Sequence, residues 1–184
     1  MLPVILRTER LVLDAPTIDD RDLVAEYCTD PVFERFMTTP WPYTLEDADS
    51  FLSAHVPAGW TSRREFTWAI RERAGGPLMG AIGHRVALQD VGFWLGAPHR
   101  GNGYMTEAVV AVCDWLFERG SESVRWECIV GNVASASVAR KAGFAFTGTA
   151  PANVSSRDGT REESWHGLLL SSDSRAERPG WPAS

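Results

Sequence analysis

The sequence predicts one domain of mixed α/β class built around a single sheet. Its 184 residues are 44% hydrophobic and 23% charged, an ordinary composition for one compact domain. A chain of this size buries roughly 70% of the surface that its unfolded form exposes. The expected order is a strand, two helices, an antiparallel run of strands, and then strand, helix, strand, helix and strand, which indicates the mixed class. We expect the domain to span residues 1–170 and the tail 171–184 to be disordered.

The first third of the chain predicts one strand and two helices. Residues 5–13 alternate apolar and polar side chains and predict the first strand. Thr17 is placed to cap a helix with an acidic first turn. Thr44 is placed to cap a second helix, with Glu46 and Asp47 following.

The middle of the chain changes to the two-residue period of strands. Residues 65–73 and 78–88 predict two strands joined by a turn at 74–77. A short apolar strand follows at 91–95, and then a helix at 104–119 that stops at Gly120. Residues 123–130 predict a strand, 134–142 a helix closed by Gly143, and 144–148 with 163–170 the last strands.

Charge and cysteine content exclude several classes of protein. Lys and Arg total 18 against 24 Asp and Glu, giving a net charge of −6, so the chain lacks the basic footprint of a nucleic-acid binder. No apolar run approaches the roughly 20 residues of a membrane span, and from the first residues we expect no signal peptide. The odd set Cys28, Cys113 and Cys128 contains no CxxC pair, which argues against a disulfide framework or a zinc site. We therefore expect a cytoplasmic protein without a metal, a nucleic-acid partner or a membrane partner.

The sharpest motif is the loop Arg100-Gly-Asn-Gly-Tyr104, between a strand that ends at Leu95 and a helix that begins near Tyr104. Glycines leave backbone N–H groups uncovered, and together with a helix N-terminus these groups can converge on a phosphate. The loop lacks the Lys-Ser/Thr of a P-loop and the third glycine of a dinucleotide fingerprint. Taken alone, it is also typical of an ordinary turn from a strand to a helix.

Three segments together resemble the GNAT superfamily of acyl-CoA-dependent N-acyltransferases, in particular its RimJ/RimL-like branch, over residues 6–170. They are residues 6–13 (LRTERLVL), residues 91–95 (VGFWL) followed by 100–108 (RGNGYMTEA), and residues 132–135 (NVAS) with 141–144 (KAGF). The resemblance implies a GNAT-like fold, with a central, mostly antiparallel and splayed sheet of six to seven strands flanked by about four helices.

The resemblance also implies acetyl-CoA as the acyl donor. The pyrophosphate is expected on the loop, and the pantetheine arm is expected to lie along residues 93–95 like an added strand. Met105 replaces a small residue of the family motif, so we expect its side chain to point away from the phosphate. The implied cofactor-binding residues are Phe93, Trp94, Leu95, Arg100, Gly101, Asn102, Gly103, Tyr104, Met105, Asn132, Ser135 and Arg140.

Three residues are implied in catalysis. The backbone N–H of Leu95 would stabilise the oxyanion, and Ser135 would protonate the leaving thiolate, with Ser137 as the alternative. Asp90 would act as general base, with a water chain as the alternative. Ser135 is also typical of a helix-capping hydroxyl and Asp90 of a carboxylate at the end of a turn.

The expected reaction is direct acetyl transfer to a primary amine, on a protein N-terminus or a small molecule, without a covalent enzyme intermediate. His84, Trp41 and Tyr43 are the expected acceptor-binding residues. Two alternatives remain: a coenzyme A-binding module without catalysis, and a transferase for a longer donor such as succinyl-CoA. The longer donor would need a cation near the acyl end, for which Arg85 and Arg71 are candidates. A homodimer is expected from the resemblance.

Overall fold

The computed structural model describes residues 2–182 and contains one eight-stranded sheet in the order β1-β2-β3-β4-β5-β6-β8-β7. Every neighbouring pair is antiparallel except β5 and β6. The strands are β1 (Leu6–Arg7), β2 (Val12–Asp14), β3 (Glu65–Arg71), β4 (Gly80–Arg85), β5 (Asp90–Leu95), β6 (Ser123–Ile129), β7 (Ala145–Pro151) and β8 (Glu163–Leu170). The expected mixed α/β fold with a mostly antiparallel sheet is confirmed.

The helices begin where the capping chemistry predicts. Thr17 and Asp20 form a capping box ahead of α1 (Arg21–Cys28), and Thr44 and Asp47 form another at the start of α3 (Leu45–Ser50). Helix α3 continues through a π-helical turn (Phe51–His55) into α4 (Val56–Ser62). The remaining helices are α2 (Pro31–Phe36), α5 (Tyr104–Glu118) and α6 (Val133–Lys141).

The sheet has one strand more than the six to seven expected, because the predicted strand at 5–13 is a hairpin of β1 and β2. Thr8 makes the turn: its N–H donates to the Leu11 carbonyl at 3.0 Å, and its hydroxyl accepts from the Leu11 N–H at 2.9 Å. Side chains of this kind compete with the sheet for backbone groups and favour turns. Helix α2 was also not expected, although Pro31 at its first turn and the Asp30 cap are typical start signals.

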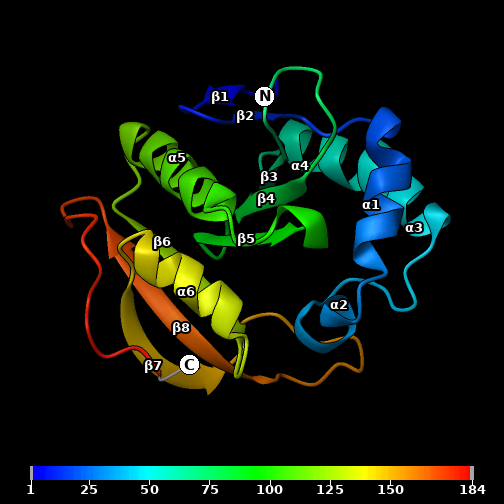
Figure 1. Cartoon of the computed structure of the whole chain (residues 1–184). Coiled ribbons are helices and arrows are strands. Elements are labelled where there is room, and N and C mark those ends of the chain that lie inside the picture. Colours follow the sequence, from blue (N-terminus) through cyan, green and yellow to red (C-terminus); the bar gives the residue numbers. More distant parts are fainter. Residues whose placement is uncertain (1, 183–184) are drawn as a thin grey trace.

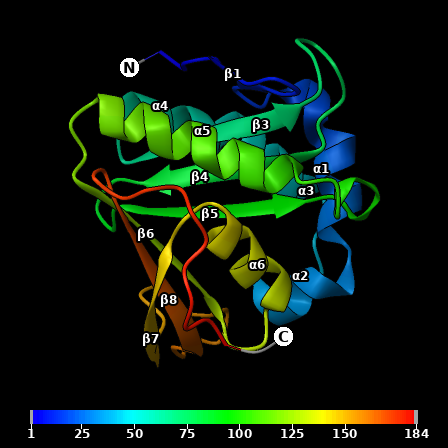
Figure 2. The same ribbon diagram turned by 60° about the vertical axis from the view of Figure 1, so that its left-hand side comes forward.

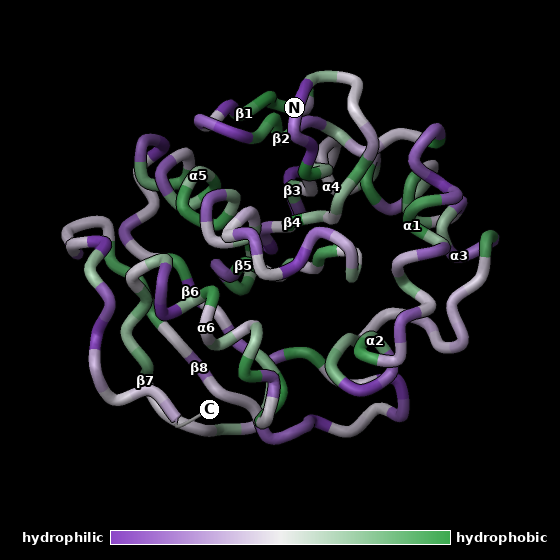
Figure 3. Tube along the Cα trace, in the orientation of Figure 1, coloured by the Kyte–Doolittle hydropathy of each residue, from purple (hydrophilic) through white to green (hydrophobic). Residues whose placement is uncertain are grey.

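Helices cover both faces of the sheet (Figure 1). Helices α5 and α6 lie on one face, as Figure 2 shows from the side, and α1 and α3 lie on the other. The larger core lies under α5, where Trp68 is fully buried and its ring meets Trp60 at 5.1 Å and Trp115 at 5.3 Å. Figure 3 shows both colours along α5, as expected of a helix with one buried face.

The segment after Leu170 was predicted to be disordered, whereas its described part, to residue 182, contacts the domain. The Trp181 ring lies 5.5 Å from the Trp126 ring, and Arg175 pairs with Asp114. The backbone of Arg175 passes so close to Gly143 that a Cβ there would lie 2.9 Å from the Arg175 Cα. The Trp181 ring packs on Trp126 of β6 and Phe146 of β7 and so provides an apolar contact for the tail. The polar composition of the tail did not predict this contact.

Candidate active site

The central feature of the site is a splay between β5 and β6. Their parallel pairing covers only Asp90 with Arg125 and Val91 with Trp126. Beyond this point β5 stays on β4 as far as Leu95, and β6 stays on β8 as far as Ile129. Figure 2 shows β6, β8 and β7 running away from β3, β4 and β5. The splay leaves one edge of β5 without a strand partner in the described structure.

The open edge of β5 presents the backbone groups of Phe93 and Leu95. The Gly96 N–H donates to the Met79 carbonyl at 2.9 Å. Because backbone groups alternate in direction along an antiparallel pair, Trp94 also faces β4, whereas Phe93 and Leu95 face the splay. The Leu95 carbonyl accepts a hydrogen bond from the Arg100 Nε at 3.0 Å. The Leu95 N–H is therefore placed to meet a molecule that lies in the splay.

The loop after β5 ends in the N-terminus of α5. Gly101 and Gly103 adopt positive φ angles of 81° and 78°, which glycine tolerates best. The first bond of α5 runs from the Glu107 N–H to the Gly103 carbonyl at 3.1 Å. The N–H groups of Tyr104, Met105 and Thr106 precede it and lack a partner within the helix. These three groups form an anion-binding end of a helix that is fifteen residues long.

Side chains around this loop brace it. The Arg100 Nη1 donates to the Asp30 carboxylate at 2.8 Å, so Arg100 ties the loop to the cap of α2. The Asn102 side chain donates to the His99 and Arg100 carbonyls. Met105 points into the core with 5% exposure. The binding groups of the loop are therefore its backbone N–H groups.

The loop opens onto a cavity of about 340 Å³, which we call the loop-side cavity. It lies between α2, the end of β5, the start of α5 and one face of α6. Lys141 lines it, whereas Arg140 pairs with Glu177 at 3.4 Å and is not among its lining residues. The structure therefore places Lys141, not Arg140, at this cavity.

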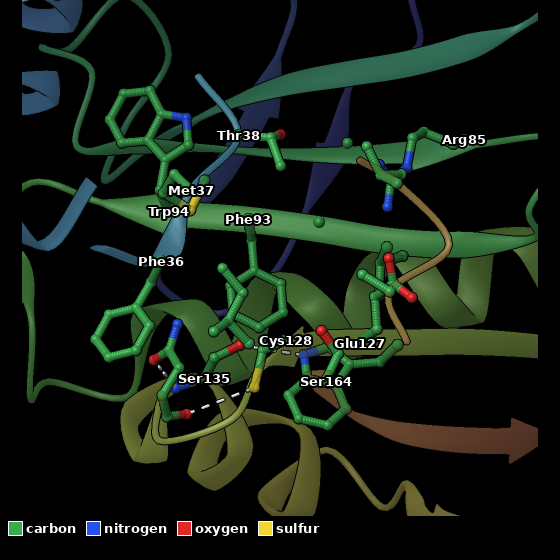
Figure 4. Close-up of a pocket in the computed structure, with 18 of the residues that line it drawn as sticks. Phe36, Met37, Thr38, Arg85, Phe93, Trp94, Glu127, Cys128, Ser135 and Ser164 are labelled. Atoms are coloured by element: carbon green, nitrogen blue, oxygen red, sulfur yellow. Dashed lines mark hydrogen bonds between the residues drawn. The ribbon is translucent and has the colours of Figure 1, made fainter. Parts of the chain in front are cut away.

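A second cavity of about 230 Å³, the sheet-side cavity, adjoins the first. It is lined by β3, β4, β5 and β6 and by the segment before β8. The two cavities share six lining residues: Phe36, Met37, Phe93, Trp94, Asn132 and Ser135. Figure 4 shows most of these side chains around the junction. The junction is thus the place where molecules in the two cavities would meet.

Ser135 lies at this junction in a defined orientation. The Trp126 Nε1 donates to the Ser135 Oγ at 3.1 Å, and the Ser135 N–H donates to the Asn132 Oδ1 at 3.1 Å. An indole N–H can only donate, so the serine hydroxyl accepts there and its own proton points elsewhere, with the Cys128 sulfur as one neighbour. Burial raises the pKa of the neighbouring Cys128 thiol to about 12, so Cys128 stays a neutral thiol.

Asp90 does not suit the role of general base that the sequence suggests. Its carboxylate accepts from the Arg85 Nε at 2.9 Å and the Arg85 Nη2 at 2.5 Å, and its side chain is 3% exposed. Both oxygens are held by one guanidinium, and Asp90 is not among the residues that line either cavity. Its geometry is that of a buried structural ion pair.

The expected acceptor-binding residues lie away from the cavities. The His84 ring stacks on Phe66, and its Nδ1 bonds the Asp90 carbonyl at 2.9 Å. Burial lowers the pKa of His84. The neighbours of His84, Gly83 and Arg85, line the sheet-side cavity instead. The prediction that His84 faces the cavity is therefore wrong, because its side chain lies on the opposite face of β4 from Gly83 and Arg85.

Trp41 and Tyr43, between α2 and α3, also lie away from the two cavities. Tyr43 is buried in the smaller core with Trp41 packed against it, and burial raises its pKa. Neither residue lines the sheet-side cavity, where Phe36, Met37, Thr38 and Phe51 are found.

Both cations considered for a longer acyl donor pair with carboxylates of the protein. Arg71 is buried between Asp14, at 2.8 Å, and Asp20, at 2.6 Å, and Arg85 is held by Asp90. Three carboxylates that the sequence did not single out line the sheet-side cavity: Glu65, Glu127 and Glu162. The alternation along residues 65–70 placed Glu65 opposite the core, and this signal could have identified it.

Comparison with known proteins shows the family of this chain. Residues 10–145 match the acetyltransferase (GNAT) domain family, so the chain belongs to the GNAT acetyltransferases. Over 118 residues it is 26% identical to the uncharacterized N-acetyltransferase p20 of Bacillus licheniformis, a match that covers 61% of this chain and 65% of that protein.

Two solved structures share the fold. The ribosomal-protein-S5-alanine acetyltransferase from Vibrio fischeri superposes with a TM-score of 0.69 at 19% identity, covering 96% of this chain and 100% of that one. The microcin C7 self-immunity acetyltransferase MccE, solved with acetyl-CoA and AMP, gives 0.73 at 18% identity, covering 89% and 93%. Within residues 2–182, no helix combines the length and the hydropathy needed to cross a membrane.

Proposed function

We propose that this protein transfers the acetyl group of acetyl-CoA directly to a primary amine, as an N-acetyltransferase of the RimJ/RimL-like branch. The observation that carries the proposal is the junction of the two cavities at Ser135 and the open edge of β5. The loop-side cavity begins at the N-terminus of α5, and the sheet-side cavity is lined by strands β3 to β6. A donor and an acceptor can therefore enter from different sides and meet in one place.

The loop-side cavity suits coenzyme A. The N–H groups at the start of α5 would hold the pyrophosphate, and Lys141 at the cavity wall adds a positive charge. The open backbone groups of Phe93 and Leu95 would pair with the amides of the pantetheine arm, like an added strand. We therefore assign cofactor binding to Lys141 in place of Arg140.

The residues at the junction suit the chemistry of amide formation. The amine nitrogen attacks the thioester carbon, the C–N bond forms, and the Leu95 N–H would stabilise the oxyanion. The C–S bond then breaks, Ser135 would give its proton to the thiolate, and the proton lost by the amine passes to water and returns to Ser135. With Asp90 held by Arg85, we assign the removal of the amine proton to water in the sheet-side cavity.

The finer properties follow from the same proposal. Cys28, Cys113 and Cys128 are free and buried, which supports a reducing cytoplasmic location. A homodimer stays a prediction from the family resemblance and is tested by the mass of the purified protein in solution.

The direct test follows free-thiol release from acetyl-CoA in the presence of a panel of amines and of short peptides with varied N-termini. We expect acetyl-CoA to raise the melting temperature of the protein and at least one amine class to accelerate thiol release. If acetyl-CoA binds but no amine accelerates release, the result favours a coenzyme A-binding module or an acceptor outside the panel. If acetyl-CoA does not bind, the assignment of the loop is wrong.

A further inference from the structure

The floor of the sheet-side cavity is a row of small residues. Thr67 on β3 pairs in register with Gly83 on β4, which pairs with Gly92 on β5. All three line the cavity. A Cβ built on Gly92 would have no atom of the described structure within 4 Å, so the space above it is open. The row forms a hollow that begins near the junction and extends along the sheet.

The side-chain oxygens Glu65 Oε1 and Thr67 Oγ1 face this hollow. Thr67 is 4% exposed, and no side chain or backbone group in the part of the chain described hydrogen-bonds its hydroxyl. A Cβ on Gly83 would lie 3.2 Å from the Glu65 Oε1 and 3.7 Å from the Thr67 Oγ1, so both oxygens border the space that Gly83 leaves free. Both oxygens can accept hydrogen bonds, so the hollow suits a ligand that donates them.

The charge around the hollow is negative. The next row of the sheet pairs Glu65 with Arg85 and Arg85 with Asp90. Burial opposes the charge of Arg85, but its hydrogen bond to Asp90 and the charges of Glu127 and Glu65 raise its pKa overall. In Figure 4 the side chains of Arg85 and Glu127 reach toward each other from opposite walls. One guanidinium thus faces three carboxylates, and Asp90 binds the edge of it formed by Nε and Nη2.

Two histidines approach the remaining carboxylates from outside. The His55 Nε2 lies 3.2 Å from a Glu65 oxygen, and the His166 Nδ1 lies 3.6 Å from a Glu127 oxygen. Neither histidine lines the cavity, where Arg85 is the one cation among the described lining residues. With Glu162 also lining the cavity, the sheet-side cavity carries an excess of negative charge.

From this geometry we propose that the acceptor of the sheet-side cavity is an amine with a second cationic group, such as an aliphatic diamine or polyamine. The proposal rests on the acetyl transfer proposed above. One amine would reach the junction at Ser135 and take the acetyl group. The second, still an ammonium, would lie over Gly83 and donate to Glu65, Glu127 and the Thr67 hydroxyl. An ammonium has three donors and no acceptor, which matches these oxygens.

An acceptor with a carboxylate in the same place is disfavoured by the same residues. It would face Glu65 and Glu127, and the only guanidinium in the described cavity wall is that of Arg85, whose Nε and Nη2 already bind Asp90. Like charges in a site of low dielectric repel strongly. The charge of the second group, rather than its size, should therefore decide which amines are accepted.

The test compares three acceptors that share one four-carbon chain: diaminobutane, butylamine and aminobutanoate. Thiol release from acetyl-CoA gives kcat/KM for each. We expect diaminobutane to exceed butylamine by about tenfold or more, and butylamine to exceed aminobutanoate. In Glu127→Gln and Glu65→Gln the ratio of kcat/KM for diaminobutane to that for butylamine should fall several-fold. The fall should come from diaminobutane, because butylamine has no second amine to meet these carboxylates.

The matched control is Glu163→Gln, which removes the same charge from an exposed residue next to Glu162 that is not among the cavity-lining residues. It should leave the ratio unchanged. Melting temperatures with and without acetyl-CoA show whether each variant is folded and binds the donor. The inference is wrong if kcat/KM for butylamine, for aminobutanoate or for a peptide with a neutral side chain next to its N-terminus equals that for diaminobutane. The proposed transferase stands in that case. If no amine releases thiol, both are wrong.

Discussion

Replacing Ser135 by alanine separates its structural role from its proposed chemical role. The Trp126 indole, whose residue is 2% exposed, donates its N–H to the Ser135 Oγ at 3.1 Å. Ser135→Ala would leave that N–H buried without a partner, which costs about 1–3 kcal/mol of unfolding free energy. In a domain of this size each kcal/mol lowers the melting temperature by roughly 2–4 °C.

The same substitution should slow turnover if Ser135 protonates the thiolate. We expect kcat to fall by roughly 10²–10⁴-fold near neutral pH, the usual worth of general acid–base help. The deficit should shrink as the pH rises past about 8.5, the ordinary pKa of a thiol, because the thiolate then needs no proton. The assay is thiol release at saturating acetyl-CoA across this pH range, with melting temperature measured on the same preparations.

Two further variants decide between the roles. Ser137 lines only the loop-side cavity and makes no bond to Trp126, so Ser137→Ala should keep both its melting temperature and most of its kcat. Trp126→Phe combined with Ser135→Ala removes the unpaired donor and should cost less stability than the sum of the two single changes. If Ser137→Ala slows turnover and Ser135→Ala does not, the orientation argument for Ser135 is refuted.

Three other predictions concern stability. Gly80→Ala should lower the unfolding free energy by about 3 kcal/mol or more in a denaturant titration, because its Cβ would lie 2.2 Å from a carbonyl oxygen of β5; a variant as stable as wild type would contradict this packing. Asp20→Asn should cost about 3 kcal/mol by the same measurement, since it removes one partner of the buried Arg71 guanidinium. The bond to Glu65 raises the pKa of His55, so the pair stabilises fully below about pH 6.5 and its contribution is lost as the pH rises through the raised pKa. The melting-temperature difference between wild type and His55→Gln should therefore be small but larger at about pH 6 than at about pH 9, and an opposite trend would disprove the pairing.

Local patterns in the sequence predicted most of the elements of this fold. The capping residues Thr17 and Thr44 and the periodicity of residues 104–119 depend on neighbours within one turn, so they can be recognised without tertiary structure. The hairpin at residues 6–14 was missed because a short alternating segment fits one strand as well as two. The Thr8 turn that divides it is bound to α5 through Glu107, nearly a hundred residues away.

The candidate site was predictable only where one segment carries it. The loop of residues 100–104 and the position of Ser135 after β6 follow from short motifs. The partner of Ser135 does not, because Trp126 reaches it from another element. His84 shows the same limit. Its strand was predicted, but the face it occupies depends on the register with β3 and β5, and a shift of one residue exchanges the two faces.

The register of β4 connects the core to the proposed specificity. Gly80 lies so close to β5 that any larger residue there would force the strands apart, which fixes the pairing of the two strands. This pairing turns Ile82 and His84 toward α5 and turns Gly83 and Arg85 into the sheet-side cavity. Glycine at position 83 then leaves the space bordered by the Thr67 and Glu65 oxygens. Arg85 lies in register between Glu65 on β3 and Asp90 on β5. A change in the residue at position 83 should therefore alter which amine is accepted while the opposite face of the strand keeps the core intact.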